Sequence, residues 1–380
     1  MEQRNSTGTR RFRRWIPVLV SLAATLLVAG VLAGTGLGRA GAGGVAAPAA
    51  PRAGAPAVAA VVPATGPRAA AGPAAVREVG AGGPTSGPGS TASAPGSAAY
   101  RSIRAAWDAG DLTEQHPVGT VWRSVRVAGQ ERRYLLSVPP AAGASAPLVI
   151  VFHGLDQRAG AFASAYGLVP ATRAAGQVLV LPESSGPAFN DGRLGAAGPD
   201  DDAFALAVVG QLAAAGTADP HRVVVAGFSN GAGMAMSVAA RHPGRVAALV
   251  SIDGALMTPA GSPRPTGPVR AYLVHGTDDP VQPWGGRAFR SLTQPAYISQ
   301  PATVAQWVQA AGGGTERTTE LGGRGSARVT EQAWTGGPGG AAVTSYAVHG
   351  MAHVWPRAGR HTVDATALVV DAGRRTAPTG

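Results

Sequence analysis

Short apolar runs alternate with helical stretches over the C-terminal part of the chain. The runs that lack polar interruptions are Leu148–Phe152, Val178–Leu181, Val223–Ala226, Val246–Ile252 and Val269–Val274. The alanine-rich stretches at 200–215, 230–241 and 302–311 have the length and composition of helices. Strands that are apolar on both faces and separated by helices are typical of a parallel sheet covered on both sides. The pattern therefore predicts an α/β fold with a mostly parallel central sheet and helices on both faces.

Two segments with alternating polarity come before the first apolar run. They are Val121–Val127 and Arg133–Val138, and Ala128–Gly129–Gln130 lies between them. Alternation around a glycine-containing turn predicts an antiparallel hairpin at the N-terminal side of the sheet. A last strand is expected at Val343–Val348, near the C-terminus.

The N-terminal residues 1–38 have the features of an export segment. Five arginines fall within residues 1–14, and the following Trp15–Gly38 has no charged residue. A positive region before an apolar run directs a chain across or into a membrane. Two outcomes stay open: cleavage near Ala40, which would release the protein, or retention as an anchor, because the run is long enough to span a bilayer.

Residues 39–99 consist almost entirely of Ala, Pro, Gly, Ser and Val. Such a segment has too few large apolar side chains to form a core, so we expect a disordered linker. Residues 100–380 are long enough to fold as one catalytic domain.

The protein is expected outside the cell or at the cell surface, because of its N-terminal export segment. We expect it to be a monomer.

The charge and the cysteine count exclude several classes of function. All 32 basic residues are arginine. Residues 1–99 hold nine arginines and two acids, whereas residues 100–380 hold 23 arginines and 19 acids, so most of the excess lies outside the domain. This distribution argues against a nucleic-acid surface. The absence of cysteine excludes disulfides and thiolate chemistry.

The segment Gly227–Phe228–Ser229–Asn230–Gly231 follows an apolar run and precedes a helical stretch. It matches G-x-S-x-G in the strand–turn–helix context that presents a nucleophilic serine at the edge of a sheet. We expect Ser229 to be the nucleophile, although a serine in a glycine-rich turn or at a helix cap is the simpler alternative.

A nucleophilic serine needs a base and an acid that orients it. The strand expected at Val269–Val274 is followed by His275–Pro280, which contains Asp278 and Asp279, and the strand at Val343–Val348 is followed by His349–Pro356. In α/β-hydrolases the order along the chain is serine, acid, histidine. The sequence thus offers an acid in the first of these segments and a base in the second.

Two backbone N–H groups are expected to form an oxyanion hole. In this fold one comes from the residue after the nucleophile, here Asn230, and the other from the loop after an earlier strand. The run Leu148–Phe152 leads into His153–Gly154–Leu155–Asp156–Gln157, so Leu155 is the second candidate.

These segments, in this order, resemble the extracellular polyhydroxybutyrate depolymerase and feruloyl esterase family of α/β-hydrolases. The resemblance rests on HGLDQ, PDDDAF, DPHRVVVAGFSNGAGMA, HGTDDPVQPWGG and HGMAHVWP, which span roughly residues 120–370. It implies an α/β-hydrolase fold and a serine esterase with Ser229 as nucleophile and His353 as base. The family pattern HGTxDP implies Asp279 as the acid. Many relatives carry cysteines that this chain lacks.

Several other residues have alternative roles. Asp278 neighbours the expected acid, and Asp253 is a second alternative, because some hydrolases take the acid from that strand. For His349, His153 and His275 a structural role is favoured over catalysis. The acidic group at residues 200–202 fits the start of a helix better than a metal site. Trp284 and Trp355 either line a substrate pocket or pack in the core.

The expected activity is hydrolysis of carboxylic esters through an acyl-enzyme, without a cofactor or metal. The substrate would be a hydroxyalkanoate polyester or its oligomers, or feruloyl or acetyl esters of polysaccharides. A serine exopeptidase of the same fold and a non-catalytic polymer-binding surface protein are the alternatives. Reporter amides and esters would distinguish them, because fold does not fix function.

Overall fold

The computed structural model describes residues 116–195, 198–257, 262–322 and 328–376. The export segment at 1–38, the linker at 39–99 and the first residues of the catalytic domain lie outside the described residues. Within the described parts of the chain, no helix combines the length and the apolar character needed to cross a membrane.

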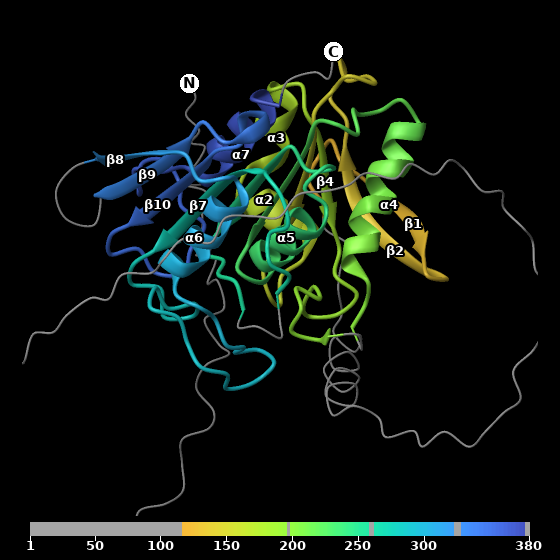
Figure 1. Cartoon of the computed structure of the whole chain (residues 1–380). Coiled ribbons are helices and arrows are strands. Elements are labelled where there is room, and N and C mark those ends of the chain that lie inside the picture. Colours follow the sequence, from red (N-terminus) through yellow and green to blue (C-terminus); the bar gives the residue numbers. More distant parts are fainter. Residues whose placement is uncertain (1–115, 196–197, 258–261, 323–327, 377–380) are drawn as a thin grey trace, which may run out of the picture. The chain divides into compact units, whose positions relative to one another are not determined.

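A ten-stranded mixed sheet forms the centre of the fold (Figure 1). Its strand order is β1-β2-β4-β3-β5-β6-β7-β10-β9-β8. The strands are β1 Val121–Val127, β2 Gln130–Ser137, β3 Leu148–Phe152, β4 Val178–Pro182, β5 Val223–Phe228, β6 Ala248–Ile252, β7 Arg270–Gly276, β8 Thr315–Leu321, β9 Val329–Thr335 and β10 Val343–Val348. The strands from β4 to β10 in this order pair in parallel, which confirms the mostly parallel sheet.

The N-terminal hairpin is confirmed, but its turn is shorter than expected. β1 and β2 pair so that Val127 faces Gln130, and only Ala128 and Gly129 lie between them. Both have positive φ, at 47° and 78°. A two-residue turn with two left-handed residues matches the twist of the strands it joins, so Gln130 becomes the first residue of β2.

An antiparallel pair at the opposite edge was not expected from the sequence. β10 pairs with β9, and β9 with β8, both antiparallel. β8 has the sequence TERTTEL and is mostly exposed, so it has no apolar run to reveal it. Polar edge strands of this kind are stabilised by their ladder and protect the sheet from pairing with other chains.

Two helical layers cover the sheet, as the apolar runs predict. The helices are α2 Ala159–Ala165, α3 Leu168–Ala174, α4 Asp201–Ala214, α5 Asn230–Arg241, α6 Gln300–Ala310 and α7 Ala365–Arg374. One core contains alternate strand residues with side chains of α4, α5 and α6, and the other contains the remaining strand residues with α2, α3 and α7. This arrangement is the α/β-hydrolase fold, and it brings the ends of β5, β6, β7 and β10 to one edge.

The acidic residues at the start of α4 have structural partners. Asp200 caps the helix by accepting from the Ala203 N–H at 2.9 Å. Asp201 is buried and pairs with Arg132 of β2 at 2.5 Å, and Asp202 accepts from the Ser237 hydroxyl at 3.2 Å. These contacts explain the three acids without a metal.

Candidate active site

Ser229 lies at the junction of β5 and α5 in a strained backbone conformation. Its φ is 56° and its ψ is −118°, and it is the N-cap residue of α5. A Cβ atom on Gly227 would press into the Gly231 carbonyl, and one on Gly231 into the carbonyls of Phe152 and His153. Both glycines are therefore required by close backbone approach, and they allow the sharp turn that exposes the serine.

Asp279 and His353 form a direct hydrogen bond across two loops. We call residues 277–299 the β7 loop and residues 349–364 the β10 loop. His353 Nδ1 lies 2.6 Å from Asp279 Oδ2. Asp279 Oδ1 accepts from the backbone N–H groups of Val281 and Gln282 at 2.7 and 2.8 Å. With Nδ1 donating to the carboxylate, Nε2 of His353 is the nitrogen that can accept a proton.

The alternative acid Asp278 does not contact His353. Its carboxylate accepts from the Thr277 hydroxyl at 3.0 Å and is exposed. The structure thus brings His353 to Asp279, the residue that the family pattern implies.

Ser229 lies in the same region as His353, but the two are not hydrogen-bonded. The ring of Phe228, the preceding residue, is 4.9 Å from the His353 ring, centroid to centroid. The Ser229 N–H donates to the Ile252 carbonyl at the end of β6 at 3.0 Å. Its hydroxyl has no hydrogen-bond partner among the residues that the structure describes. Such contacts are often long before substrate binds.

Asp253, the second alternative acid, lies next to the Asp279–His353 pair. Its Oδ2 is 4.0 Å from His353 Nδ1. Burial and the neighbouring Asp279 raise its pKa well above the usual range of a carboxyl group. One ligand atom each of Asp253, Asp279 and His353 could approach a cation, since these atoms lie within 4.8 Å of one another. Hydrogen bonds to Gly276, Val354, Val281, Gln282 and His353 already occupy all four carboxylate oxygens.

The two expected oxyanion donors have free backbone N–H groups. Among the described residues, neither Leu155 nor Asn230 donates its N–H to an acceptor. Gln157 Oε1 accepts from the Gly154 N–H at 2.7 Å and so holds the loop that carries Leu155. The side chain of Asn230 accepts from the Phe189 N–H and donates to its carbonyl, at 2.8 and 3.0 Å. Both donors are therefore on backbone held by side chains that sequence reasoning did not identify.

Trp355 packs within an aromatic cluster beside His353. Its ring meets the Phe162 ring edge-on at 5.3 Å and stacks on Tyr166 at 5.2 Å, and its Nε1 donates to the Thr366 hydroxyl at 3.1 Å. The side chain is 3% exposed. It also lines a cavity of about 650 Å³ together with Gln157, Phe228 and His353.

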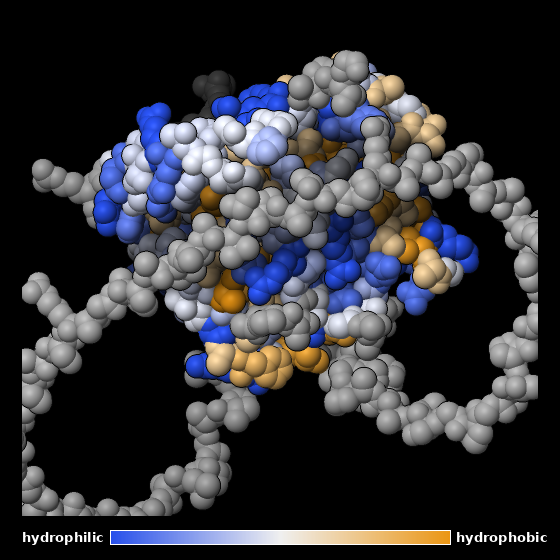
Figure 2. All heavy atoms as spheres, in the orientation of Figure 1, coloured by the Kyte–Doolittle hydropathy of each residue, from blue (hydrophilic) through white to orange (hydrophobic). Residues whose placement is uncertain are grey.

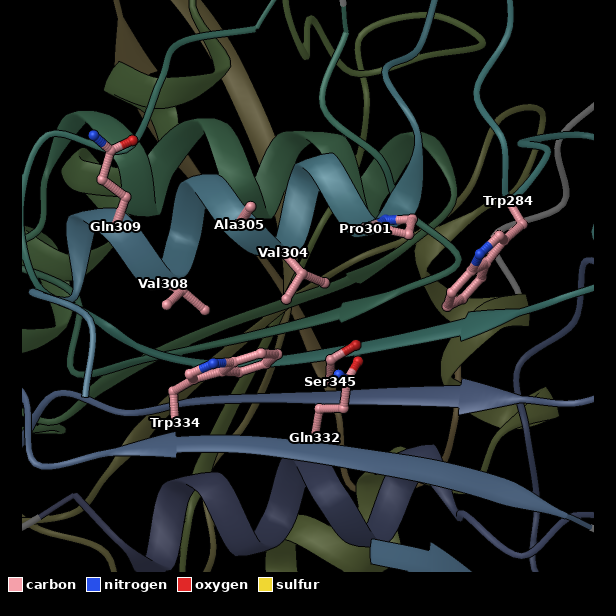
Figure 3. A pocket seen from close by; sticks show the side chains of 9 residues that line it. All are labelled: Trp284, Pro301, Val304, Ala305, Val308, Gln309, Gln332, Trp334 and Ser345. Atoms are coloured by element: carbon pink, nitrogen blue, oxygen red, sulfur yellow. The ribbon is translucent and has the colours of Figure 1, made fainter. Parts of the chain in front are cut away.

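Trp284 lies in a different pocket from Trp355. Figure 3 shows it at one end of a groove between α6 and the strands β9 and β10, with Trp334 farther along. This pocket has a volume of about 370 Å³. The Trp284 ring meets the His275 ring at 6.0 Å. The two tryptophans expected at the substrate therefore do not line one cavity.

The other histidines have structural partners. Burial lowers the pKa of His153 and of His275, which keeps both rings neutral. His153 Nδ1 bonds the Gly154 carbonyl at 2.9 Å, and His275 Nε2 bonds the Gln282 carbonyl at 2.8 Å. His349 Nε2 lies 2.9 Å from the Thr330 hydroxyl on β9. The structural roles favoured from the sequence are consistent with these contacts.

The surface near the site is partly apolar. Figure 2 shows hydrophilic side chains over much of the drawn face, with separate hydrophobic areas. Six large hydrophobic side chains of the described residues are exposed, and three of them, Val281, Phe289 and Val354, belong to the β7 and β10 loops. Apolar side chains are thus concentrated in the loops that carry Asp279 and His353.

Comparison with known proteins identifies relatives among esterases. Residues 132–266 match the family model described as Esterase PHB depolymerase. The chain is 35% identical over 269 residues to "Putative esterase NocK" of Nocardia uniformis subsp. tsuyamanensis, covering 64% of this chain and 77% of that protein.

Solved structures with a similar course of the chain include two esterases. The acetyl xylan esterase from Aspergillus awamori matches 63% of this chain and 96% of its own, with a TM-score of 0.46 and 15% identity. Esterase 2 of Thermogutta terrifontis matches 69% and 96%, with a TM-score of 0.46 and 14% identity.

Proposed function

The chain belongs to the esterase family described as Esterase PHB depolymerase and is a carboxylic ester hydrolase. From this premise we propose that it works through a Ser229–His353–Asp279 triad. The observation that carries the proposal is the 2.6 Å hydrogen bond between His353 Nδ1 and Asp279 Oδ2. The ring of Phe228 lies 4.9 Å from the His353 ring, and Phe228 directly precedes Ser229, which is held at φ 56° between strand and helix. Both features match what the activation of a hydroxyl nucleophile requires.

The proposed reaction begins with proton transfer from the Ser229 hydroxyl to His353 Nε2 as the hydroxyl attacks the ester carbonyl. Asp279 holds the imidazole in the tautomer with Nδ1 protonated and stabilises the imidazolium. The N–H groups of Leu155 and Asn230 bind the developing oxyanion. His353 then protonates the leaving alkoxide, and water attacks the acyl-enzyme by the same route.

The proposed substrate class is an ester with an apolar acyl or polymer part. The cavity beside His353 has about 650 Å³, and Phe228, Tyr166 and Trp355 form aromatic walls beside the polar Gln157, Arg357 and Arg360. The exposed Val354 lines this cavity, and Val281 and Phe289 are exposed on the β7 loop. Hydroxyalkanoate oligomers or polyester and feruloyl or acetyl esters of polysaccharides all remain within this class. We propose Trp355 as part of the wall of the acyl site and Trp284 as a more distant contact for a longer substrate.

The proposed location is outside the cell or at its surface. Support comes from residues 1–38, with their arginine-rich start and uncharged apolar run. Fractionation of cells that express the full chain, with detection in the medium and in the membrane fraction, distinguishes a cleaved signal from an anchor. An intact chain in the cytoplasm would contradict the proposal.

The catalytic proposal is tested by ester hydrolysis with the full chain and Ser229→Ala. A panel of p-nitrophenyl acetate and butyrate, methyl ferulate, hydroxybutyrate oligomers and an aminoacyl anilide covers the classes above. We expect ester turnover that falls about 10⁶-fold in Ser229→Ala, and normal turnover in the control Ser291→Ala. Turnover retained in Ser229→Ala would overturn the triad, and cleavage of the anilide alone would favour an exopeptidase.

A further inference from the structure

Asp253 is a buried carboxyl group that the proposed reaction does not use. It follows β6, is 0% exposed and has a φ of 48°. Its Oδ1 accepts from the Gly276 N–H and its Oδ2 from the Val354 N–H, both at 2.9 Å. Gly276 ends β7 just before the β7 loop, and Val354 follows His353. One side chain thus links the segments that carry the acid and the base.

Asp253 also lies close enough to interact with both members of the pair. Its Oδ2 is 4.0 Å from His353 Nδ1, compared with 2.6 Å for Asp279 Oδ2. His275, on β7, is the other titratable group at this point, with its Nε2 3.5 Å from Asp279 Oδ2. Two buried carboxyl groups therefore lie beside two imidazoles.

The charges in this space do not balance if both carboxyl groups are ionised. His275 stays neutral because burial lowers its pKa, so His353 is the one cation that the reaction can form there. Burial and the charge of Asp279 raise the pKa of Asp253 well above its usual range. Two neighbouring carboxylates without enough cations hold a proton between them.

We propose that Asp253 is a positioning residue that holds the β10 loop as a neutral carboxylic acid, and that it ionises and becomes the partner of His353 when the charge of Asp279 is removed. This inference rests on the proposed triad. Burial, the larger cause of the raised pKa of Asp253, remains when Asp279 is removed, but the repulsion is gone. His353, 4.0 Å away, then has Asp253 as its carboxyl partner, so Asp253 releases its proton to solvent and the net charge of the site is unchanged. His353 Nδ1 lies 4.0 Å from Asp253 Oδ2, compared with 2.6 Å from Asp279 Oδ2. A shift of the imidazole by this difference would bring it into hydrogen-bond distance of Asp253.

A double-mutant cycle tests the proposal. Asp253→Asn resembles a neutral acid but can accept only one of the two N–H bonds, so we expect kcat/KM within about tenfold of the wild type. Asp279→Ala should lower kcat/KM about 10²- to 10³-fold. Adding Asp253→Asn to Asp279→Ala should lower kcat/KM by a factor at least about ten times larger than Asp253→Asn does in the wild type. If Asp253→Asn lowers kcat/KM by the same factor in the wild type and in Asp279→Ala, Asp253 has only a structural role. That result would overturn the proposal that Asp253 replaces Asp279 as the partner of His353. Asp278→Asn is the exposed control.

The pH profile tests the protonation state separately. If Asp253 is neutral, Asp253→Asn leaves the acidic limb of kcat/KM within about 0.3 pH unit of the wild type. An ionised Asp253 stabilises the imidazolium, so its removal would move that limb about one unit lower and overturn the proposal.

A readout without substrate separates this inference from the proposed function. The imidazole titration of His353, followed by NMR in the same variants, should be unchanged by Asp253→Asn in the wild type and lowered by it in Asp279→Ala. Thermal unfolding identifies any variant that fails to fold. If the wild type hydrolyses no ester, the proposed function fails, while the titration still decides the state of Asp253.

Discussion

The nucleophile and the acid–base pair are held in place in two different ways. Ser229 lies between a buried strand and a buried helix, and the residues that determine its conformation are Gly227 and Gly231, two positions away on either side. Asp279 and His353 lie in loops that follow two different strands and are 74 residues apart in sequence. Local steric contacts fix the first, and hydrogen bonds between distant segments fix the second.

The two loops are joined by bonds that involve few large side chains. The Asp278 N–H donates to the Met351 carbonyl at 3.1 Å, and the Gly350 N–H donates to the Thr277 hydroxyl at 3.0 Å. A Cβ atom on Gly276 would press into the Met351 carbonyl, so the loops approach closely there. This comparison teaches that substitutions near the serine should act through folding, whereas substitutions in the loops should act mainly through the orientation of His353.

After Ser229→Ala, the largest effect on activity is expected for Asp279→Asn. Its amide would keep an oxygen for the Val281 and Gln282 N–H groups but present N–H to His353 Nδ1, which favours the wrong tautomer. We expect kcat/KM to fall about 10⁴-fold with little change in thermal stability, measured with a p-nitrophenyl ester and by calorimetry. A loss below tenfold would mean that Asp279 does not orient the base.

A large effect on folding is expected for Gly231→Ala at the serine. The new methyl group meets the carbonyl oxygens of Phe152 and His153, which belong to the central sheet and the following loop. Overpacking against fixed backbone should cost about 3 kcal/mol or more of the free energy of unfolding. Urea denaturation measures it.

The matched control is Gly210→Ala inside α4, where no atom lies within 4 Å of the new Cβ. Alanine is favoured over glycine in a helix, so this variant should gain about 0.5 to 1 kcal/mol. Equal stability of the two alanine variants would contradict the steric account of the junction.

The same contrast explains what could be predicted from the sequence. Strands β3 and β10 were predicted with their observed bounds, because each is a short run with a clear apolar pattern. The serine motif is local, and its glycines reveal it. β8 and β9 were missed since their residues are polar or partly exposed, and the short helices α2, α3 and α7 were not identified.

Contacts between distant residues left no trace in the sequence. Asp253 was considered only as an alternative acid, and its bond to the Val354 N–H joins residues 101 positions apart. The holding roles of Gln157 and Asn230 depend on loop conformations that no periodicity encodes. Trp284 and Trp355 were each expected to line a substrate pocket or to pack in the core, because they flank the segments of the acid and the base. The β7 loop places Trp284 in the pocket beside α6, away from the cavity that Trp355 lines.

The pH dependence of stability distinguishes the buried carboxyl group of Asp253 from an ordinary surface acid. Because the folded pKa of Asp253 is raised, the folded chain keeps this proton above the unfolded value of about 3.9. Its contribution to stability is therefore present at low pH and is lost as pH rises through the folded pKa. The Asp253→Asn side chain does not titrate, so its stability does not fall in this way. The Tm of the variant minus the Tm of the wild type should therefore increase by about 2 to 4 °C from pH 4 to pH 8. A constant difference would mean that Asp253 titrates normally.

The smallest effect is expected for Thr277→Val, which removes one bond between the β7 and β10 loops. The lost acceptor of the Gly350 N–H is partly exposed, so water can replace it, and the cost should be about 0.5 to 1 kcal/mol. Because Gly350 is only three residues before His353, a loosened loop should lower kcat about three- to tenfold. Thr277→Ser keeps the hydroxyl and should restore the rate. If Thr277→Val and Thr277→Ser have the same kcat, this bond does not help to orient His353. Asp253 and Asp279 are then sufficient to hold its ring in place.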